Sequence, residues 1–297
     1  MIKTHHYAGP MHGGSCAAPT PSQHRRVWIN GACYEDESHA AVPATDHGFV
    51  AGDGVFEVLK VTEAGPFAVQ RHLNRLSRSS AAMGLPAPDH TRIRAAIDQL
   101  LDGRKFSHGR LRITYTGGLG PLTSGAPYGP PTLVVAVEPA PLASASTAIV
   151  TSPWTRNENG ALAGVKSTSY AENVRALAYA TNRRATEAMF VNTEGNLCEG
   201  TGTNVFVVID GTIITPPLSS GPLAGITREV ILEWCDVEER DVTLAEARAA
   251  DEVFLTSSMR DVQAVHRWDE IDLGRAHPVT SRVTATFAER SSSVIDP

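Results

Sequence analysis

The stretch GVKSTSYAENVRALAYA, residues 164–180, places one lysine, Lys166, after a short apolar step and directly before a run of helix-forming residues. A lone lysine near the start of a helix is most often a surface cation. The alternative is a reactive amine whose position is fixed by a helix and by neighbouring strands. The choice depends on which other groups the chain can bring close to Lys166.

The length and composition limit the classes of protein that the chain can belong to. With 297 residues we expect two domains, and 42% hydrophobic and 20% charged residues are typical of a folded globular protein. A formal net charge of −6, with scattered basic residues, argues against nucleic acid as the main partner. No apolar run is long enough to span a membrane, and residues 1–26 lack the apolar core of a signal peptide.

The four cysteines, at positions 16, 33, 198 and 235, form no C-x-x-C pair and have no regular spacing. Neither a disulfide framework nor a metal site is therefore expected, and we predict a cytoplasmic location.

The first half of the chain has the pattern of an α plus β domain. RVWINGACY, residues 26–34, is typical of a hairpin with an Asn-Gly turn. Apolar periodicity predicts two helices, the first from Val69 to Gly84 and the second over residues 90–103. Strands are predicted at residues 52–61, 109–116 and 131–138.

The second half is separated from the first by PAPLASAS, residues 139–146, which has the composition of a linker. A strand at residues 147–152, the helix after Lys166, short strands within residues 188–217, a helix from residue 225 and a strand at residues 251–258 are predicted. Thr243 and Glu246 form a capping-box pattern. We expect a mobile arm at residues 1–26, a small α/β domain at residues 27–140 and a larger domain at residues 147–297.

Two segments have the features of phosphate sites. GPLAGITREV, residues 221–230, leads a turn into a helix and presents backbone N–H groups and the Thr227 hydroxyl, although an ordinary helix cap has the same pattern. FLTSSMRDV, residues 254–262, brings the Ser257 and Ser258 hydroxyls to the end of a predicted strand, where a simple turn is the alternative.

A carboxylate and an arginine complete a set of groups suited to one cofactor. Glu199 precedes a glycine-rich turn, and Arg75 lies in a predicted helix; each alone is typical of an exposed residue. Together with Lys166 and the two phosphate sites they are what pyridoxal 5'-phosphate needs. The amine forms a Schiff base, the acid keeps the pyridine nitrogen protonated, and the remaining groups neutralise the phosphate.

The order of six motifs resembles that of the class IV aminotransferases, the pyridoxal-phosphate fold type IV. The motifs are DHGFVAGDGVFEVLKV, HLNRLSRSSAAMGLP, VKSTSYAENVRA, EGNLCEGTGTNVF, GPLAGITREVILE and DEVFLTSS, and the resemblance extends from about Val27 to Val265. This family includes branched-chain and D-amino-acid aminotransferases and aminodeoxychorismate lyases. It implies an α/β fold with a small N-terminal domain, a larger C-terminal pseudo-barrel domain, and a homodimer with a shared active site.

The resemblance also implies roles for individual residues. Lys166 is similar to the catalytic lysine, which carries a proton between the substrate and the cofactor and whose pKa its neighbourhood lowers. Glu199 is similar to the partner of the pyridine nitrogen, and Leu223 to the apolar side chain under the ring. The implied cofactor-binding set is Arg75, Lys166, Glu199, Leu223, Ile226, Thr227, Ser257 and Ser258.

Three further residues are candidates for substrate contacts. Phe56 stands where D-amino-acid aminotransferases carry a substrate-facing tyrosine. Arg112 is similar to an arginine of branched-chain enzymes that helps to receive acidic substrate groups, and a solvent-facing strand arginine is the alternative. Tyr170 is similar to a tyrosine near the cofactor but is displaced by one residue, so a packing role is equally open.

These features predict an amino-acid transaminase that moves an amino group between a branched-chain-like or D-amino acid and a 2-oxo acid. The alternative is 4-amino-4-deoxychorismate lyase, which forms 4-aminobenzoate and pyruvate with the same lysine. A non-catalytic relative that only binds the cofactor is a third hypothesis. Retention of Lys166, Glu199 and Arg75 argues against it, because such a protein needs no Schiff-base amine.

Overall fold

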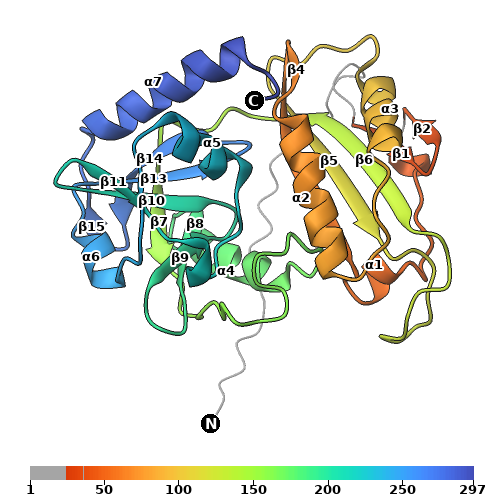
Figure 1. Ribbon diagram of the computed structural model, residues 1–297, viewed down its shortest axis with the longest axis horizontal. Coiled ribbons are helices and arrows are strands. Elements are labelled where there is room, and N and C mark those ends of the chain that lie inside the picture. The colour runs from red at the N-terminus through yellow and green to blue at the C-terminus, as the bar shows by residue number, and fades with distance from the viewer. Residues whose placement is uncertain (1–24, 36) are drawn as a thin grey trace, which may run out of the picture.

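The computed structural model describes residues 25–35 and 37–297, and in it two β-sheets lie side by side, each with its own helices (Figure 1). The chain passes from the first sheet to the second between Pro139 and Ser146. The domains assigned to residues 27–140 and 147–297 stay a prediction, with which this change of sheet agrees. Of the predicted arm, residues 1–26, all but the last two residues lie outside the described residues.

The first sheet is antiparallel, with the strand order β2-β1-β6-β5-β3-β4. The predicted hairpin is confirmed: Asn30 and Gly31 have φ of 49° and 115°, the conformation that a tight two-residue turn requires. The strands are β1 Arg26–Ile29, β2 Ala32–Tyr34, β3 Gly54–Thr62, β4 Gly65–Pro66, β5 Gly109–Thr116 and β6 Thr132–Pro139.

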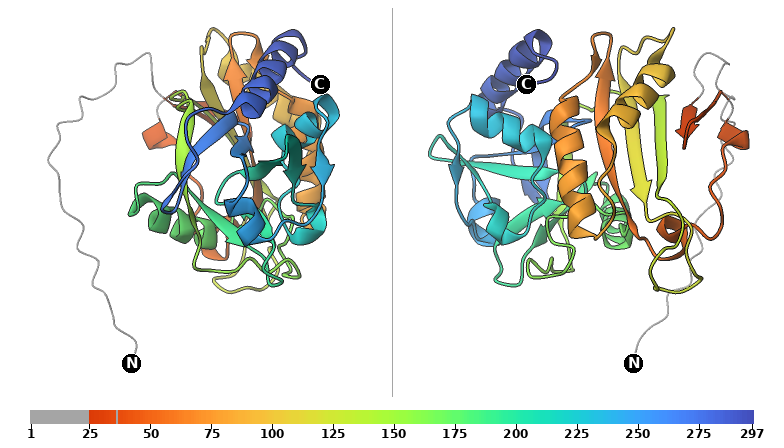
Figure 2. Two further views of the ribbon diagram at one scale, coloured as in Figure 1. Left: turned by 90° about the vertical axis from the view of Figure 1, so that its left-hand side faces the viewer. Right: turned by 45° about the vertical axis from the view of Figure 1, so that its right-hand side comes forward.

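Helices α2 (Val69–Ala82) and α3 (His90–Leu101) belong to this sheet, as the apolar periodicity predicts. Figure 2 shows α2 between the two sheets. Its position is fixed from both sides, because Leu73 and Leu76 are buried in the core of the first sheet while Arg71 donates to both Glu233 oxygens at 2.7 and 2.8 Å.

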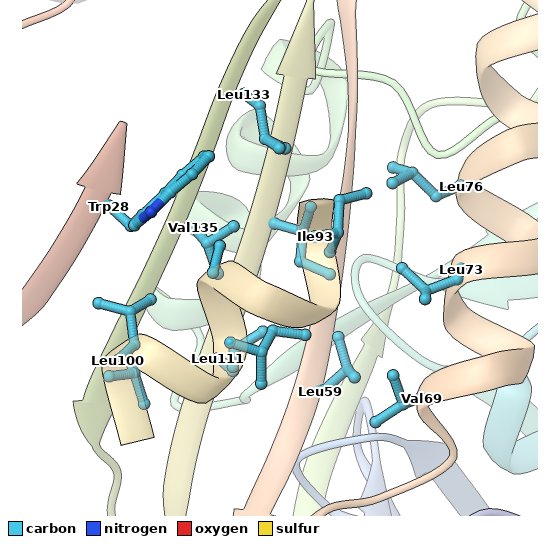
Figure 3. Close-up of a cluster of buried hydrophobic side chains, with 14 of the residues drawn as sticks. Trp28, Leu59, Val69, Leu73, Leu76, Ile93, Leu100, Leu111, Leu133 and Val135 are labelled. Carbon is cyan, nitrogen blue, oxygen red and sulfur yellow. The ribbon is translucent and has the colours of Figure 1, made fainter. Parts of the chain in front are cut away.

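The core of the first sheet is the apolar layer between its strands and these two helices (Figure 3). Leu59 and Leu111 lie on neighbouring strands and pack with Leu73 of α2 and Ile93 of α3; all four are fully buried. Burial of such leucines and isoleucines stabilises a fold by about 1.5–3 kcal/mol each. The two helices are therefore held against the strands by a continuous apolar layer.

The second sheet has nine strands, mixed in direction, in the order β12-β11-β10-β13-β14-β7-β8-β9, with β15 paired to β14. Strands β9 and β10 are far apart in this order, yet only residues 201–203 separate them in the chain. Three residues span about 10 Å, so the sheet curves to bring these strands together. The strands are β7 Ser146–Thr151, β8 Glu187–Val191, β9 Leu197–Gly200, β10 Asn204–Ile209, β11 Thr212–Thr215, β12 Glu238–Glu239, β13 Glu252–Ser257, β14 Asp261–Trp268 and β15 Ile271–Asp272.

The helices of this half connect or cover its strands. Helix α4 (Ala171–Thr181) links the parallel strands β7 and β8, whereas α5 (Ile226–Trp234) and α7 (Pro278–Ser293) pack on the sheet through Val230 and Phe287. The sequence patterns do not predict α7, because its apolar residues are few among serine, threonine and charged residues. The remaining short helices are η2 Glu37–His39, α1 His47–Val50, η3 Leu218–Ser220 and α6 Leu244–Arg248, the last capped by Thr243. In the described part of the chain, no helix combines the length and apolar character needed to cross a bilayer.

Candidate active site

A cavity of about 660 Å³ is lined by residues from both sheets and from the segments around α2, α4 and α5. Every residue that the sequence predicts for the site lines it, and these residues come from positions up to 202 apart in the chain. They are Phe56, Arg75, Arg112, Lys166, Tyr170, Glu199, Leu223, Ile226, Thr227, Ser257 and Ser258. The fold therefore brings the predicted residues together in one place, while their individual roles stay predictions.

Lys166 is positioned by backbone hydrogen bonds to the first sheet, although it belongs to the second half of the chain. Phe56 N–H donates to the Lys166 carbonyl at 2.9 Å, and Thr168 N–H donates to the Gly54 carbonyl at 2.8 Å. Lys166 N–H donates to Ser79 Oγ of α2 at 3.3 Å. The segment after the linker thus pairs with the start of β3, which fixes the direction in which the lysine side chain leaves the backbone.

The amine of Lys166 lies 4.5 Å from the centre of the Phe56 ring. No carboxylate of the described residues forms an ion pair with it. Burial lowers the pKa of Lys166 to about 8, and the charges of Arg75 and Arg112 act in the same direction, against Glu57 and Glu199. The amine is therefore neutral in a large fraction of molecules near pH 8, which a nucleophile or proton acceptor requires.

Arg75 is held by a buried carboxylate that the sequence patterns did not single out. Its Nε and Nη2 donate to Glu57 at 2.8 and 2.6 Å, and its Nη1 donates to the Ala224 carbonyl at 2.9 Å. His72, one turn earlier on α2, lies with Nδ1 2.7 Å from Glu57. Burial raises the pKa of Glu57, but the charge and hydrogen bonds of Arg75, with those of His72, lower it to about 2. Arg75 is consequently fixed in one orientation at the cavity wall.

Glu199 also lines the cavity, and burial raises its pKa. Its Oε2 accepts a hydrogen bond from Leu223 N–H at 2.9 Å, and Arg156 Nη2 lies 3.8 Å from Oε1. Arg156 opposes the effect of burial on the Glu199 pKa and is itself placed over the Phe190 ring at 4.2 Å. The carboxylate is thus directed by the backbone of the turn that leads into α5.

The N-terminus of α5 faces the same cavity and has the features of an anion site. Its N-cap is Gly225, which provides no side-chain acceptor, so the first backbone N–H groups are available to a ligand. A Cβ on Gly225 would lie 1.9 Å from Asn204 Oδ1, so no larger residue fits without displacing its surroundings. Thr256 also lines the cavity, and its buried Oγ1 has no hydrogen-bond partner in the described part of the protein.

The three predicted substrate residues form one cluster. The Arg112 guanidinium lies 3.9 Å from the centre of the Phe56 ring, and Tyr170 packs against the same ring edge-on at 5.3 Å. The Tyr170 hydroxyl donates to the Thr201 carbonyl at 2.8 Å, and burial raises its pKa to about 12. Both hypotheses for Tyr170 remain compatible with this geometry, because it packs against Phe56 and also lines the cavity.

Reasoning from the sequence missed three polar residues near the site: Glu57, His72 and Arg156. Glu57 lies between apolar residues in β3, a position where a carboxylate needs a buried partner, and His72 and Arg75 are spaced by three residues on α2. These two patterns together could have indicated that Glu57 contacts His72 and Arg75. No local pattern indicates Arg156, because its position beside Glu199 depends on the folding of distant segments.

Comparisons with known proteins agree with this geometry. The family described as amino-transferase class IV matches residues 54–268. A putative branched-chain-amino-acid aminotransferase of Methanocaldococcus jannaschii is 30% identical, over 82% of this chain and 88% of the relative. A bifunctional aminodeoxychorismate lyase / D-amino acid transaminase of Mycobacterium tuberculosis is 31% identical, over 85% of this chain and 92% of the relative. The PLP-bound structure of a hypothetical aminotransferase from M. tuberculosis is 26% identical with a TM-score of 0.80, covering 92% of this chain and 100% of the other.

The chain therefore belongs to the class IV aminotransferases, a family of pyridoxal-phosphate-dependent enzymes of fold type IV. The family, fold class, enzyme class and cofactor expected from the sequence are confirmed. The described residues fit the cofactor: Arg75, the α5 N-terminus and the unpaired Thr256 hydroxyl suit its phosphate, Glu199 suits its ring nitrogen, and Lys166 supplies an amine.

Proposed function

We propose that this protein is an amino-acid transaminase that transfers an amino group from a branched-chain-like or D-amino acid to a 2-oxo acid. Both kinds of donor are supported by the names of the relatives. Catalysis is assigned to Lys166, and cofactor binding to the set of eight residues predicted from the sequence. Phe56, Arg112 and Tyr170 are assigned to the substrate.

The observation that carries this proposal is that the Lys166 amine and the Arg112 guanidinium both lie over the Phe56 ring. Arg112 donates only to Thr114 Oγ1, at 3.1 Å, and has no carboxylate partner among the described residues. An unpaired guanidinium in a cavity is suited to a planar carboxylate. Lys166 and Arg112 contact the same Phe56 ring, so an amino acid bound by its carboxylate has its reacting carbon near the amine.

When bound, pyridoxal phosphate supplies a ring that withdraws electrons from the carbon bearing the substrate amino group. Lys166 takes a proton at Nζ and returns it, which a pKa of about 8 permits at neutral to mildly basic pH. Glu199 would accept a hydrogen bond from the ring nitrogen and so keep that nitrogen protonated. Arg75 and the α5 N-terminus would hold the phosphate and so orient the ring toward Lys166.

Aminodeoxychorismate lyase is the second candidate function, because the name of the M. tuberculosis relative includes both activities. The lyase and the transaminase use the same lysine, so the residues of the cofactor site do not separate them. What differs is the substrate, which in the lyase reaction carries a ring that is released as 4-aminobenzoate.

The test is to incubate the purified, cofactor-loaded protein with L-leucine, L-glutamate, D-alanine or aminodeoxychorismate, each with and without a 2-oxo acid acceptor. One equivalent of the donor's 2-oxo acid per bound cofactor without an acceptor, and many equivalents when an acceptor is present, supports the transaminase and gives its stereochemistry. Release of 4-aminobenzoate and pyruvate, with no turnover of any amino acid, would replace it by the lyase. Lys166→Ala serves as the control and is expected to abolish either activity.

We further propose that the protein acts as a homodimer in the cytoplasm. The strongly exposed large apolar side chains include Phe49 on α1 (79%), and Leu122 (75%) and Tyr128 (73%) in the loop between β5 and β6. This loop is bound to the α1 segment through the hydrogen bond from Gly120 N–H to the Thr45 carbonyl. A second copy of the chain would remove these side chains from water.

The dimer is tested by light scattering on the wild type and on Leu122→Glu. The wild type is expected to have twice the monomer mass, and the variant is expected to have the monomer mass. Leu142→Glu is the matched control, since Leu142 is equally exposed (79%) but lies in the linker between the two sheets. A monomeric wild type would refute the dimer.

A further inference from the structure

Lys60 is a buried cation that the reaction does not use. Side chains alternate along β3, so Phe56, Val58 and Lys60 lie on the same face. The first two line the cavity, whereas Lys60 continues this face beyond it and is only 8% exposed. Its Nζ donates to both carboxylate oxygens of Asp261, at 2.6 and 2.7 Å. Because Asp261 begins β14, this ion pair joins the first sheet to the second.

The Lys60 end of this ion pair is buried beside two aromatic rings, whereas the Asp261 side chain is 37% exposed. The Lys60 amine lies 5.5 Å from the Phe67 ring centre and 5.4 Å from the Phe287 ring centre. Both rings are buried. A buried ammonium without its counter-charge is costly, so Lys60 keeps Asp261 close and limits the separation between β3 and β14.

Asp261 lies at the base of the turn that carries two predicted phosphate ligands. In the pairing of β13 with β14, Asp261 stands directly opposite Ser257, and Ser258 follows in the turn between them. Asp261 itself has a φ of 52°, in the left-handed region that ends the turn. The position of the Ser257–Ser258 hydroxyls is therefore coupled to the position of Asp261.

Strand β3 also positions the other side of the same phosphate site. Its Glu57 holds Arg75 through two hydrogen bonds, and His72 bridges the two sides, with Nδ1 2.7 Å from Glu57 and Nε2 3.5 Å from Ser258 Oγ. One strand thus places an arginine through Glu57 and two serines through Lys60.

We propose that Lys60 and Asp261 are positioning residues for the cofactor phosphate: their ion pair holds the Ser257–Ser258 turn at the distance from Arg75 at which both contact one phosphate group. This inference rests on the proposed function of the cavity. It assigns to the pair a role in recognising the phosphate specifically, and not only in stabilising the contact between the two sheets.

The test compares two ligands that differ only in the phosphate. Dissociation constants of pyridoxal 5'-phosphate and of pyridoxal are measured by absorbance for the wild type and for Asp261→Asn, which removes the charge and tolerates a positive φ. Asp261→Asn is expected to bind pyridoxal 5'-phosphate about tenfold more weakly and pyridoxal as tightly as the wild type. In the cofactor-free protein, the stabilisation by inorganic phosphate in thermal melts is expected to fall in parallel.

Asp269→Asn is the matched control. Asp269 follows the other end of β14, also has a positive φ (51°), and pairs with Arg248 at 3.1 Å, away from the cavity. It is expected to lower the melting temperature without changing the ratio of the two dissociation constants. Asp261→Asn with the wild-type ratio, or with both ligands weakened equally, would show a merely structural pair and overturn the proposal.

Two further outcomes are separated by the same design. If Asp261→Asn does not fold, Lys60→Arg is used, because it keeps the charge pair but changes its length. A wild-type ratio of the two dissociation constants in this variant overturns the proposal. A lower preference for pyridoxal 5'-phosphate over pyridoxal supports it. A wild-type protein that binds neither ligand would refute the proposed function itself.

Discussion

Replacement of Glu57 by glutamine is expected to destabilise the protein strongly, because this carboxylate is the only counter-charge of Arg75 that the described residues provide. Glu57 is fully buried and accepts hydrogen bonds from Arg75 and His72. Arg75, with His72, lowers the pKa of Glu57 from its ordinary 4.5 to about 2 against the effect of burial. A glutamine of the same shape leaves a buried guanidinium without a partner of opposite charge.

The size of this destabilisation follows from the ordinary pKa of Glu57, 4.5, and its lowered pKa of about 2. A factor of ten in proton affinity corresponds to about 1.4 kcal/mol, so the lowered pKa of Glu57 stabilises the fold by about 3 kcal/mol at neutral pH. Loss of one partner of a buried ion pair costs about 3–5 kcal/mol, which agrees. The folded-state pKa lies below the unfolded value, so the contribution is complete above pH 4.5 or so. It is lost as the pH falls towards 2.

The assay is urea unfolding of the cofactor-free wild type, Glu57→Gln and Glu57→Asp at pH 7 and at pH 3, followed by tryptophan fluorescence. Glu57→Gln is expected to lower the free energy of unfolding by about 3 kcal/mol or more at pH 7, and by less at pH 3. Glu57→Asp keeps the charge and is expected to lose less. A loss below about 1 kcal/mol at pH 7, or an equal loss at both pH values, would refute the reasoning.

The remaining predictions concern the cavity. In the cofactor-free protein, Lys166 is expected to react with an amine-acylating reagent with a midpoint near pH 8, the value to which its pKa is lowered; a midpoint near 10.5 would contradict this. Arg75→Gln removes a cation that lowers the Lys166 pKa, so this midpoint is expected to move to higher pH in the same assay. Gly225→Ala brings Cβ within 1.9 Å of Asn204 Oδ1 and is expected to weaken cofactor binding at least about tenfold in an absorbance titration. Gly202→Ala, whose Cβ would lie 3.8 Å from its nearest neighbour in the same cavity, is the control and is expected to bind normally.

Local patterns in the sequence account for most of the secondary structure. The Asn30-Gly31 turn, the periodic leucines of α2 and the Thr243 cap are local features, and the structure confirms each of them. Helix α7 was not predicted, because its three main apolar positions become meaningful only once the second sheet provides a surface for them. The curvature of that sheet depends equally on pairings between distant strands.

The sequence by itself determined the set of chemical groups: an isolated lysine, a carboxylate beside a glycine-rich turn, an arginine and two turns suited to phosphate. These are short-range features, and their order along the chain indicated the family. Only the tertiary structure decided the environment of each group. The pKa of Lys166 near 8 depends on charges from distant parts of the chain. The ion pair of Arg75 with Glu57 and that of Lys60 with Asp261 join residues up to 201 positions apart. Their energies depend on burial and on distances between charges, which arise only when the two sheets pack together.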